Sequence, residues 1–339
     1  MISGKYLRLN NFIFRITYNS SKWFRLVVDR FIFTKIFSTF VPNKLVMTII
    51  EFMKKFGTRE SCLAHIAQLK WGNGYSCSKC QCKTFTKGYT YLAHRCKSCL
   101  YDESVTANTI FHGVKFPLVK AFLICYRLST KKGMSSYEIA KEVGVTQKTA
   151  WLFCAKMRTV MQSSGDHPLT GEVHVDECVI GGKEANQPGR SLGKKRPVLM
   201  MVEVRGKHTI GRVYAKRIAN YKKETVYPIL ENTIKKDAKI LTDQYPTYDK
   251  LTDKFPNAEQ IKSMKGANFL EMHQQIMNMK SGLRGIHHKC SDKHLQSYLD
   301  QYCFRTNRRT MAKPIVLNLI QKIIIKDVIN YQYLKAIAA

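Results

Sequence analysis

Acidic residues are scarce in this chain. It has 24 aspartates and glutamates against 56 lysines and arginines among its 339 residues, which gives a formal net charge of +32. The excess of positive charge runs through the whole sequence, and such an excess attracts the phosphate backbone of nucleic acids. The composition therefore favours a nucleic-acid-binding protein over a basic protein without such a partner.

Long apolar runs are also missing. No stretch reaches the roughly 18 residues of a membrane-spanning helix, and basic residues interrupt any signal-peptide core near the start of the chain. No internal repeat or low-complexity segment is visible, and a hydrophobic content of 45% is ordinary for a globular protein. The sequence therefore predicts two or three folded domains, without a membrane segment or an export signal.

Residues 1–46 differ from the rest of the chain. They carry ten aromatic residues and a charge of +7, but no coherent periodicity. We interpret them as an extension that is not native, with the natural start at Met47, because an amphipathic run begins directly after that methionine. The alternative is a basic arm that binds a membrane surface or DNA.

Two pairs of closely spaced cysteines stand out between residues 75 and 105. Cys77 and Cys80 form one C-x-x-C hook, and Cys96 and Cys99 form another after an interval of fifteen residues. Two such hooks can present four thiolates to one zinc ion. This spacing predicts a zinc ribbon rather than disulfides or four unrelated thiols.

Two further residues leave an alternative ligand set open. Cys82 and His94 lie in the same segment, and either could replace one of the four cysteines. The remaining cysteines are scattered without pairing, and we interpret them as reduced thiols. They are Cys62, Cys125, Cys154, Cys178, Cys290 and Cys303.

A helical pattern follows the ribbon. An apolar-periodic helix covers 114–130, and Ser135-x-x-Glu138 is a capping box that opens a second helix. Gly144 then makes a turn, and Thr146 caps a third helix. This pattern predicts a helix-turn-helix, with an ordinary helical hairpin as the alternative. Base edges would be read from the exposed first turn of the third helix, at Gln147, Lys148 and Thr149.

The rest of the chain alternates strand-like and helical patterns. A stretch with proline and glycine at 163–171 marks a domain boundary. Beyond it the order β-β-β-α-β-α is typical of an RNase H-like domain. The expected strands are 172–180, 197–205, 208–216 and 238–241, and the expected helices are 222–235 and 268–284.

The sequence as a whole therefore predicts an α+β or α/β multidomain protein. Residues 47–110 form a helix and the zinc ribbon, and residues 111–162 form the helix-turn-helix region. Residues 170–310 form the RNase H-like catalytic domain with a mixed sheet. Residues 311–339 form a helical tail for packing or oligomerisation.

Two aspartates lie on strands of this last large domain. Asp176 sits inside an apolar strand, and Asp243 ends the strand that includes Leu241. A carboxylate in such a position is costly unless something neutralises it. Two neighbouring strands can bring the carboxylates together on a pair of Mg²⁺ ions that supports phosphoryl transfer. A cap or a salt bridge would explain either aspartate alone, so the pair is what predicts a metal site.

From about Met47 to Arg309 the chain resembles the zinc-ribbon transposases of bacterial insertion sequences, a group of the DDE superfamily with an RNase H-like core. The residues that carry the resemblance are the two cysteine hooks, Val175-Asp176-Glu177 with Gly181-Gly182, Leu241-Thr242-Asp243 with Tyr248, and a block from Met277 to Arg309.

This resemblance implies an enzyme that cuts and joins DNA strands at the ends of a mobile element. Asp176 and Asp243 are then ligands of catalytic Mg²⁺ or Mn²⁺, beside a structural Zn²⁺ in the ribbon. The implied partner is double-stranded DNA, as terminal inverted repeats and as target. We expect a homo-oligomer on DNA, in the bacterial cytoplasm with the nucleoid, and no membrane partner.

The third metal-site position departs from the family pattern. Many relatives carry Glu or Asn seven residues before a lysine, whereas here His273 precedes Lys280 at that distance. A neutral imidazole can bind Mn²⁺ or Mg²⁺, although it suits hard cations less well than a carboxylate. Glu271 competes, because it flanks the buried stripe of the same helix on the other side. We predict His273 as the third ligand and Lys280 as a phosphate contact.

Basic side chains outside these motifs are expected to contact DNA phosphates, with a solvated charged surface as the alternative. They are Lys183, the run Lys194-Lys195-Arg196, Arg305, Arg308 and Arg309.

Two other functions compete with an active transposase. One is a catalytically silent DNA-binding regulator, derived from a transposase, that keeps the zinc ribbon and the helix-turn-helix. The other is a structure-selective nuclease of the same fold, which cuts without joining. Intact Asp176 and Asp243 favour the enzyme.

Overall fold

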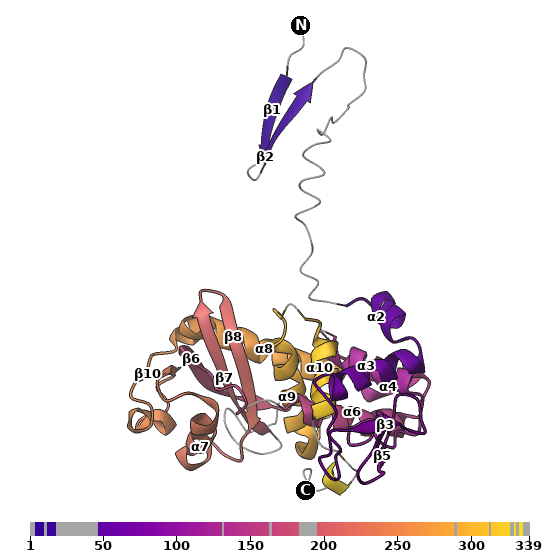
Figure 1. Cartoon of the computed structure of the whole chain (residues 1–339). Coiled ribbons are helices and arrows are strands. Elements are labelled where there is room, and N and C mark those ends of the chain that lie inside the picture. The colour runs from indigo at the N-terminus through magenta and orange to yellow at the C-terminus, as the bar shows by residue number, and fades with distance from the viewer. Residues whose placement is uncertain are drawn as a thin grey trace. The chain divides into compact units, whose positions relative to one another are not determined.

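The computed structural model divides the chain into two compact units, Met1–Lys44 and Leu45–Ala339. In the first, β1 (Gly4–Leu9) pairs antiparallel with β2 (Phe12–Thr17). The second holds the other helices and strands (Figure 1). No helix within the described residues is long and apolar enough to cross a membrane. The structure describes residues 4–9, 12–17, 47–130, 132–162, 165–182, 195–287, 290–311, 313–325, 329 and 332–334.

Two helices open the second unit, where a single helical segment was expected. They are α2 (Ile49–Phe56) and α3 (Arg59–Trp71). The chain breaks between them because Thr58 adopts an extended conformation and its hydroxyl accepts a hydrogen bond from the Ser61 amide at 3.2 Å. This cap satisfies an amide at the start of α3, so a new helix begins there.

The cysteine-rich segment forms a small antiparallel sheet. Its strands are β3 (Phe85–Lys87), β4 (His94–Cys96) and β5 (Asp102–Glu103). The Lys70 ammonium on α3 lies 2.6 Å from the Glu103 carboxylate, and both side chains are largely buried. Lys70 also donates to the carbonyl oxygen of Ala107 at 2.8 Å. This buried ion pair fixes the sheet against α3, since breaking it would leave a charge without a partner.

The next three helices follow the predicted pattern closely. They are α4 (Leu118–Ser129), α5 (Ser136–Val143) and α6 (Gln147–Met161). The capping box at α5 is confirmed, because the Glu138 amide donates to the Ser135 hydroxyl and the Glu138 carboxylate accepts from the Ser135 amide. Gly144 ends α5 in the left-handed conformation, with φ +66°. Thr146 caps α6, as expected.

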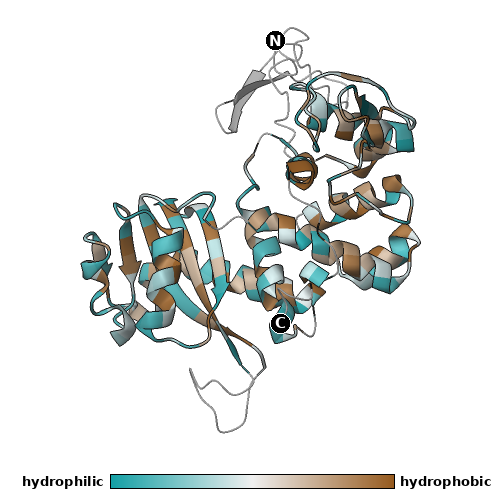
Figure 2. Cartoon of the chain, turned by 60° about the horizontal axis from the view of Figure 1, so that its bottom comes forward, coloured by the Kyte–Doolittle hydropathy of each residue, from teal (hydrophilic) through white to brown (hydrophobic). Residues whose placement is uncertain are grey.

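The C-terminal helix completes the core of these N-terminal helices. Helix α10 (Ile315–Ile325) packs against α3, α4 and α6. It buries Val316, Leu319, Ile320 and Ile323 in the same hydrophobic cluster as Phe52, Phe122 and Phe153. Figure 2 shows hydrophobic residues interspersed with hydrophilic ones along the helices of the chain. The tail therefore serves packing, which is one of the two roles expected for it.

A five-stranded mixed sheet forms the centre of the C-terminal half. Its order is β10-β9-β6-β7-β8. Strands β6, β7 and β8 pair antiparallel, whereas β9 runs parallel to β6 and β10 runs parallel to β9. This arrangement is that of an RNase H-like domain. The bounds are β6 Glu172–Ile180, β7 Arg196–Gly206, β8 Thr209–Arg217, β9 Lys239–Thr242 and β10 Ala258–Gln260.

Three helices and three short 3₁₀ turns accompany the sheet. Helix α8 packs on β6 and β7, and α9 packs on β8. The short strand β10 was not predicted, because three residues are too few for a visible alternation. The bounds are α7 Lys223–Thr233, α8 Leu270–Ile286, α9 Asp292–Thr306, η1 Pro246–Tyr248, η2 Leu251–Asp253 and η3 Met264–Phe269.

Helix α6 meets helix α9 between the helical region and the sheet. The buried Arg158 donates from Nε to the Gln301 side-chain oxygen at 2.8 Å. Its guanidinium also lies over the Tyr298 ring, 4.7 Å from the ring centroid. These contacts join the helical region to the domain that carries the two aspartates.

The turn between α5 and α6 gives a test of this local structure. We expect Gly144→Ala to destabilise the protein by about 1–2 kcal/mol, because an L-residue is strained in the left-handed region. A Cβ at this position would meet no backbone atom, so the cost is conformational. Urea denaturation followed by circular dichroism measures it.

Gly282→Ala is the matched control. Gly282 lies in α8, and a Cβ there has open space. The same substitution should therefore stabilise the protein by up to about 1 kcal/mol. A Gly144→Ala variant as stable as the wild type would contradict the conformation of this turn.

Candidate metal centres and nucleic-acid interface

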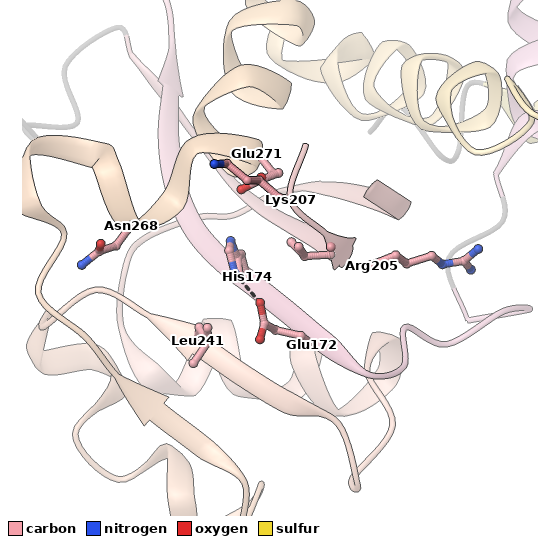
Figure 3. A pocket seen from close by; sticks show the side chains of 9 residues that line it. Glu172, His174, Arg205, Lys207, Leu241, Asn268 and Glu271 are labelled. Carbon is pink, nitrogen blue, oxygen red and sulfur yellow. Dashed lines mark hydrogen bonds and ion pairs between the residues drawn. The ribbon is translucent and has the colours of Figure 1, made fainter. Parts of the chain in front are cut away.

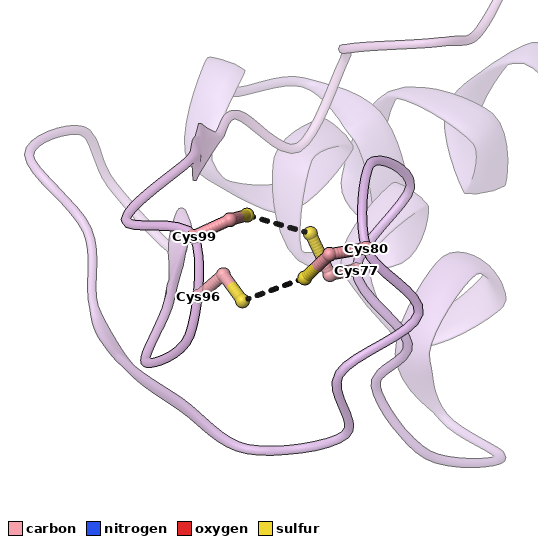
Figure 4. A group of neighbouring side chains, drawn as sticks. All are labelled: Cys77, Cys80, Cys96 and Cys99. Carbon is pink, nitrogen blue, oxygen red and sulfur yellow. Dashed lines mark hydrogen bonds between the residues drawn. The ribbon is translucent and has the colours of Figure 1, made fainter.

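The four predicted cysteines lie together in the ribbon. The sulfur atoms of Cys77, Cys80, Cys96 and Cys99 are all within 4.8 Å of one another (Figure 4). The Sγ–Sγ distance is 3.6 Å for Cys77 and Cys99 and 3.5 Å for Cys80 and Cys96. Tetrahedral zinc with Zn–S bonds of about 2.3 Å separates its sulfurs by about 3.8 Å. The geometry therefore fits one zinc ion.

Backbone hydrogen bonds in the first C-x-x-C hook favour the thiolate form of Cys77. Cys77 and Cys96 are fully buried, while Cys80 and Cys99 lie on the outside. Burial opposes ionisation of Cys77, but hydrogen bonds from the backbone of Cys80 and Lys79 outweigh it and lower the pKa of the Cys77 thiol to about 6. Only the thiolate is a metal ligand, so this hook is suited to bind a cation near neutral pH.

The alternative ligands lie outside the cluster. The Cys82 sulfur faces the Thr84 hydroxyl at 3.3 Å instead. The His94 ring is stacked between Phe85 and Trp71, with centroid distances of 3.7 and 4.0 Å. Neither side chain belongs to the group of close sulfur ligands. The four-cysteine set is thus the arrangement that the structure supports.

The register of two parallel strands brings the segments of the predicted aspartates next to each other. Val173, His174 and Val175 of β6 pair with Ile240, Leu241 and Thr242 of β9. Asp176 is the next residue on β6, and Asp243 is the first residue after β9. By alternation along β6, Asp176 lies on the same face of the sheet as His174.

Side-chain hydrogen bonds hold the segment that follows Asp243. Gln260 of β10 donates to the carbonyl oxygens of Asp243 and Tyr245, at 3.4 and 3.2 Å. The Tyr227 hydroxyl of α7 donates to the carbonyl oxygen of Thr247 at 3.0 Å. Tyr248 donates to the Glu177 carboxylate of β6 at 2.5 Å. The turn after β9 is therefore attached to three surrounding elements.

Helix α8 presents His273 and Lys280 on one flank. Seven residues span nearly two full turns, so both side chains leave the helix in almost the same direction. Lys280 lies close enough to Cys178 of β6 for its charge to lower the pKa of that thiol, which burial raises to about 12 overall. Cys178 shares a strand face with Asp176. This flank therefore faces the aspartate side of the sheet.

The His273 ring sits in a space kept open by a glycine. A Cβ on Gly266 would lie 2.9 Å from the His273 Cδ2 atom, and Gly266 has a φ of +94°. The ring nitrogen Nε2 of His273 is buried and has no hydrogen-bond partner in the described part of the chain. An imidazole nitrogen with an unused lone pair is the donor that a metal ligand requires.

Glu271 points to the other side of α8. Its carboxylate accepts a hydrogen bond from the His208 amide, in the β7–β8 turn, at 2.8 Å. Partial burial opposes ionisation, but this hydrogen bond lowers the pKa of Glu271 below its ordinary value. The Glu271 carboxylate is thus held by the β7–β8 turn, in a cavity that His174 of β6 and Leu241 of β9 also line.

Glu271 lines a cavity of about 480 Å³ at the amino end of β6. Figure 3 shows His174 and Glu172 in it, joined by a contact of 3.2 Å between His174 Nε2 and the Glu172 carboxylate. Asp176, Asp243 and His273 are not among the described residues that line this cavity. Sequence reasoning did not identify it, although Glu172, His174 and Asp176 share a strand face by alternation.

The donors around the aspartates fit a divalent cation in their chemistry. Asp176 within β6 and Asp243 directly after β9 offer the carboxylate oxygens that Mg²⁺ and Mn²⁺ prefer, and His273 offers a nitrogen. Among the described residues, the ligand atoms of Asp176, Asp243 and His273 do not all lie as close to one another as the four cysteine sulfurs do. The structure therefore shows which elements carry the three candidate ligands: β6 carries Asp176, the turn after β9 carries Asp243, and α8 carries His273.

The predicted reading residues lie at the start of α6. Gln147 and Lys148 are exposed. Gln147 makes a long hydrogen bond of 3.5 Å to the Ser136 hydroxyl. Thr149 is half-buried, and its amide and hydroxyl both contact the capping Thr146. Gln147 and Lys148 are thus available to a ligand, whereas Thr149 supports the cap.

The predicted phosphate-binding arginines differ in exposure. Arg308 is only 5% exposed, and its guanidinium donates to the Asn318 side chain at 2.6 Å. It lies over the Phe304 ring, so the expected phosphate contact of Arg308 is wrong. Arg309 is exposed and donates to the carbonyl oxygen of Gly211 at 3.2 Å. Arg305 is half-buried against Gly133.

The rest of the predicted basic set is Lys183, Lys194, Lys195 and Arg196. Arg196 begins β7 and forms an ion pair with Asp292 at 3.3 Å. Lys183 and Lys194 lie outside the described residues.

Comparison with known proteins supports the C-terminal assignment. Residues 168–307 match the family model described as the ISXO2-like transposase domain. An uncharacterized protein in transposable element ISH50 of Halobacterium salinarum is 27% identical over 151 residues, which cover 42% of this chain. The chain spans about half the length of this relative, since the match covers 50% of it. The segment that includes Asp176 and Asp243, from residue 168 to residue 307, is therefore similar to the ISXO2-like transposase domains.

Proposed function

We propose that this protein is a DDE-type DNA transposase of an insertion sequence, which binds the ends of the element and catalyses metal-dependent cleavage and transfer of DNA strands. The register of β6 and β9 supports this proposal, because its last pair, Val175 and Thr242, directly precedes Asp176 and Asp243. The match to transposase domains covers both aspartates.

Asp176, Asp243 and His273 would hold Mg²⁺ or Mn²⁺. When bound, the cations supply activation of the attacking hydroxyl and stabilisation of the leaving oxygen. Lys280 lies on the same flank of α8 as His273, where its ammonium would contact a DNA phosphate next to the metal ligands. The aspartates and the histidine thus hold the reacting centre, and the lysine holds the backbone of the substrate.

The ribbon and the α5–α6 pair would bind the DNA. The ribbon holds Zn²⁺ on its four cysteines and acts as a structural module. Helices α5 and α6 form a helix-turn-helix whose exposed Gln147 and Lys148 would contact base edges in the major groove. Arg305 and Arg309 would contact phosphates. Joining two element ends requires two sets of reading residues, so we also propose that copies of the chain assemble on DNA.

Zinc content tests the ribbon. The full chain should bind one zinc, and Cys96→Ser should lose it, because Cys96 is a fully buried member of the cluster. Elemental analysis of the purified protein measures both. Cys82→Ser is the matched control, since the Cys82 sulfur lies nearby but outside the cluster. Full zinc content in Cys96→Ser, or its loss in Cys82→Ser, would count against the four-cysteine site.

Strand cleavage tests the third ligand. His273→Ala should reduce cleavage at least about 100-fold, because removing a ligand forfeits several kcal/mol of charge stabilisation. Glu271→Gln should stay within about threefold of the wild type, since it keeps an oxygen for the His208 amide. The assay uses a plasmid that carries the DNA flanking the reading frame, with Mg²⁺ or Mn²⁺.

Asp176→Ala and Asp243→Ala serve as the inactive references, and zinc content and DNA binding show that each variant is folded. An active His273→Ala together with an inactive Glu271→Gln would reverse the assignment of the ligand. Full activity in Asp176→Ala would exclude the proposed enzyme and leave a DNA-binding protein.

Sequence discrimination tests the reading helix. Gln147→Ala should reduce the preference for element-end DNA over random duplex by about tenfold, because a good base contact contributes about 1–3 kcal/mol. Gln162→Ala, at the other end of α6, removes the same side chain and should leave the preference unchanged. Competition binding at one fixed salt concentration gives the ratio. Equal ratios for both variants would remove Gln147 from the reading surface.

A further inference from the structure

The buried contact between Tyr248 and Glu177 has a particular place in the fold. Tyr248 is 1% exposed and Glu177 is 8% exposed. The Tyr248 hydroxyl donates to the Glu177 carboxylate at 2.5 Å. Burial and the nearby Glu177 raise the pKa of Tyr248 well above its ordinary value, so the hydroxyl keeps its proton and remains the donor. A hydrogen bond to a charged group is stronger than one between neutral groups.

Glu177 points away from the proposed metal ligands. It follows Asp176 on β6, and consecutive side chains of a strand leave opposite faces of the sheet. Its own amide donates to the Asp176 carboxylate at 2.7 Å. One residue therefore contacts the first aspartate through its backbone and the turn after β9 through its side chain.

Tyr248 belongs to the segment that carries the second aspartate. It lies in η1, five residues beyond Asp243. Glu177 contributes the largest part of the charge effect that raises the pKa of the Tyr248 hydroxyl, and the charges of Asp176 and Asp243 act in the same direction. Backbone pairing between β6 and β9 ends at Val175 and Thr242. Asp176 is still paired with Met200 of β7, whereas Asp243 lies one residue beyond β9 and outside the strand pairing.

We propose that Tyr248 and Glu177 are positioning residues that fix the distance between Asp176 and Asp243 by tying the turn after β9 to β6. This inference rests on the proposed function, because the two aspartates are the metal ligands there. The hydrogen bond between Tyr248 and Glu177 joins β6 to the turn after β9, just beyond the last backbone pair of β6 and β9. The two carboxylates would have to converge at this point to share a metal ion. Loss of a residue that supports metal ligands typically costs about 10–100-fold in metal affinity or activity.

Binding of Mn²⁺ to the full-length, zinc-loaded protein tests the proposal. Tyr248→Phe keeps the ring and removes the hydroxyl, so Mn²⁺ affinity at the Asp176-dependent site should fall by about tenfold or more. Titration calorimetry or the electron paramagnetic resonance signal of free Mn²⁺ measures it, with Asp176→Ala as the reference without the site. Strand cleavage should need a correspondingly higher Mn²⁺ concentration and recover near the wild-type rate at saturation.

Tyr214→Phe is the matched control. Tyr214 is also buried, and its hydroxyl donates to the carbonyl oxygen of His167 at 2.9 Å, on strand β8. The Tyr214→Phe substitution removes the phenol hydroxyl and its hydrogen bond to His167 in the same domain, but it changes neither β6 nor the turn after β9. Its Mn²⁺ affinity should stay within about twofold of the wild type. A merely structural role for Tyr248 would give the two variants the same affinity and the same loss of thermal stability.

A second pair of variants avoids a buried, unpaired carboxylate. Glu177→Gln retains an acceptor for the Tyr248 hydroxyl, and Glu177→Gln with Tyr248→Phe removes the donor as well. These two proteins differ by one hydroxyl, so their comparison holds even if Tyr248→Phe alone does not fold. The double variant should bind Mn²⁺ about tenfold more weakly than Glu177→Gln.

The possible failures are distinct. Equal Mn²⁺ affinity in Glu177→Gln and in the double variant overturns the positioning role, while Asp176-dependent binding in the wild type still supports the metal site. Absence of Asp176-dependent Mn²⁺ binding in the wild type overturns the proposed function itself, together with this inference.

Discussion

Parallel pairing of β6 with β9 is the constraint on which the C-terminal half depends. A parallel ladder requires the chain to cross over and return, and here the crossover contains β7, β8 and α7. The pairing brings the segments of Asp176 and Asp243 next to each other in a protein that is otherwise strongly basic. Helix α8 packs on β6 and brings the positive charge of Lys280 close to Cys178, two residues beyond Asp176.

The helical region and the sheet are connected by specific contacts. Arg158 of α6 meets Gln301 of α9, and α9 in turn packs on β8. A helix that starts with the proposed reading residues is therefore linked by its C-terminal half to the domain of the proposed reaction. In a transposase, such a connection would hold the recognised bases and the cleaved phosphate at a set separation. It gives the fold a physical reason to place α6 between the two parts.

Local sequence patterns predicted the elements well where the signal is short-range. The capping box at Ser135, the turn at Gly144 and the four-cysteine cluster all depend on neighbours within a few residues or on one metal geometry. The strands β6, β7 and β8 were also anticipated, because alternation and apolar content persist over nine or more residues. The strand β10 has three residues and left no such pattern.

Contacts between distant residues could not be predicted in this way. Arg308 has the same sequence signature as its neighbour Arg309, yet one is buried against Asn318 and the other is exposed. The contact of Glu271 with the His208 amide joins α8 to the β7–β8 turn, and no pattern within the helix itself predicts it.

The packing of α10 on α3 has consequences for synthesis on the ribosome. The N-terminal helices cannot complete their core until some 250 further residues have emerged, so closing that core is slow. The helices that carry the proposed reading residues therefore complete their shared core only after the whole sheet domain has been synthesised.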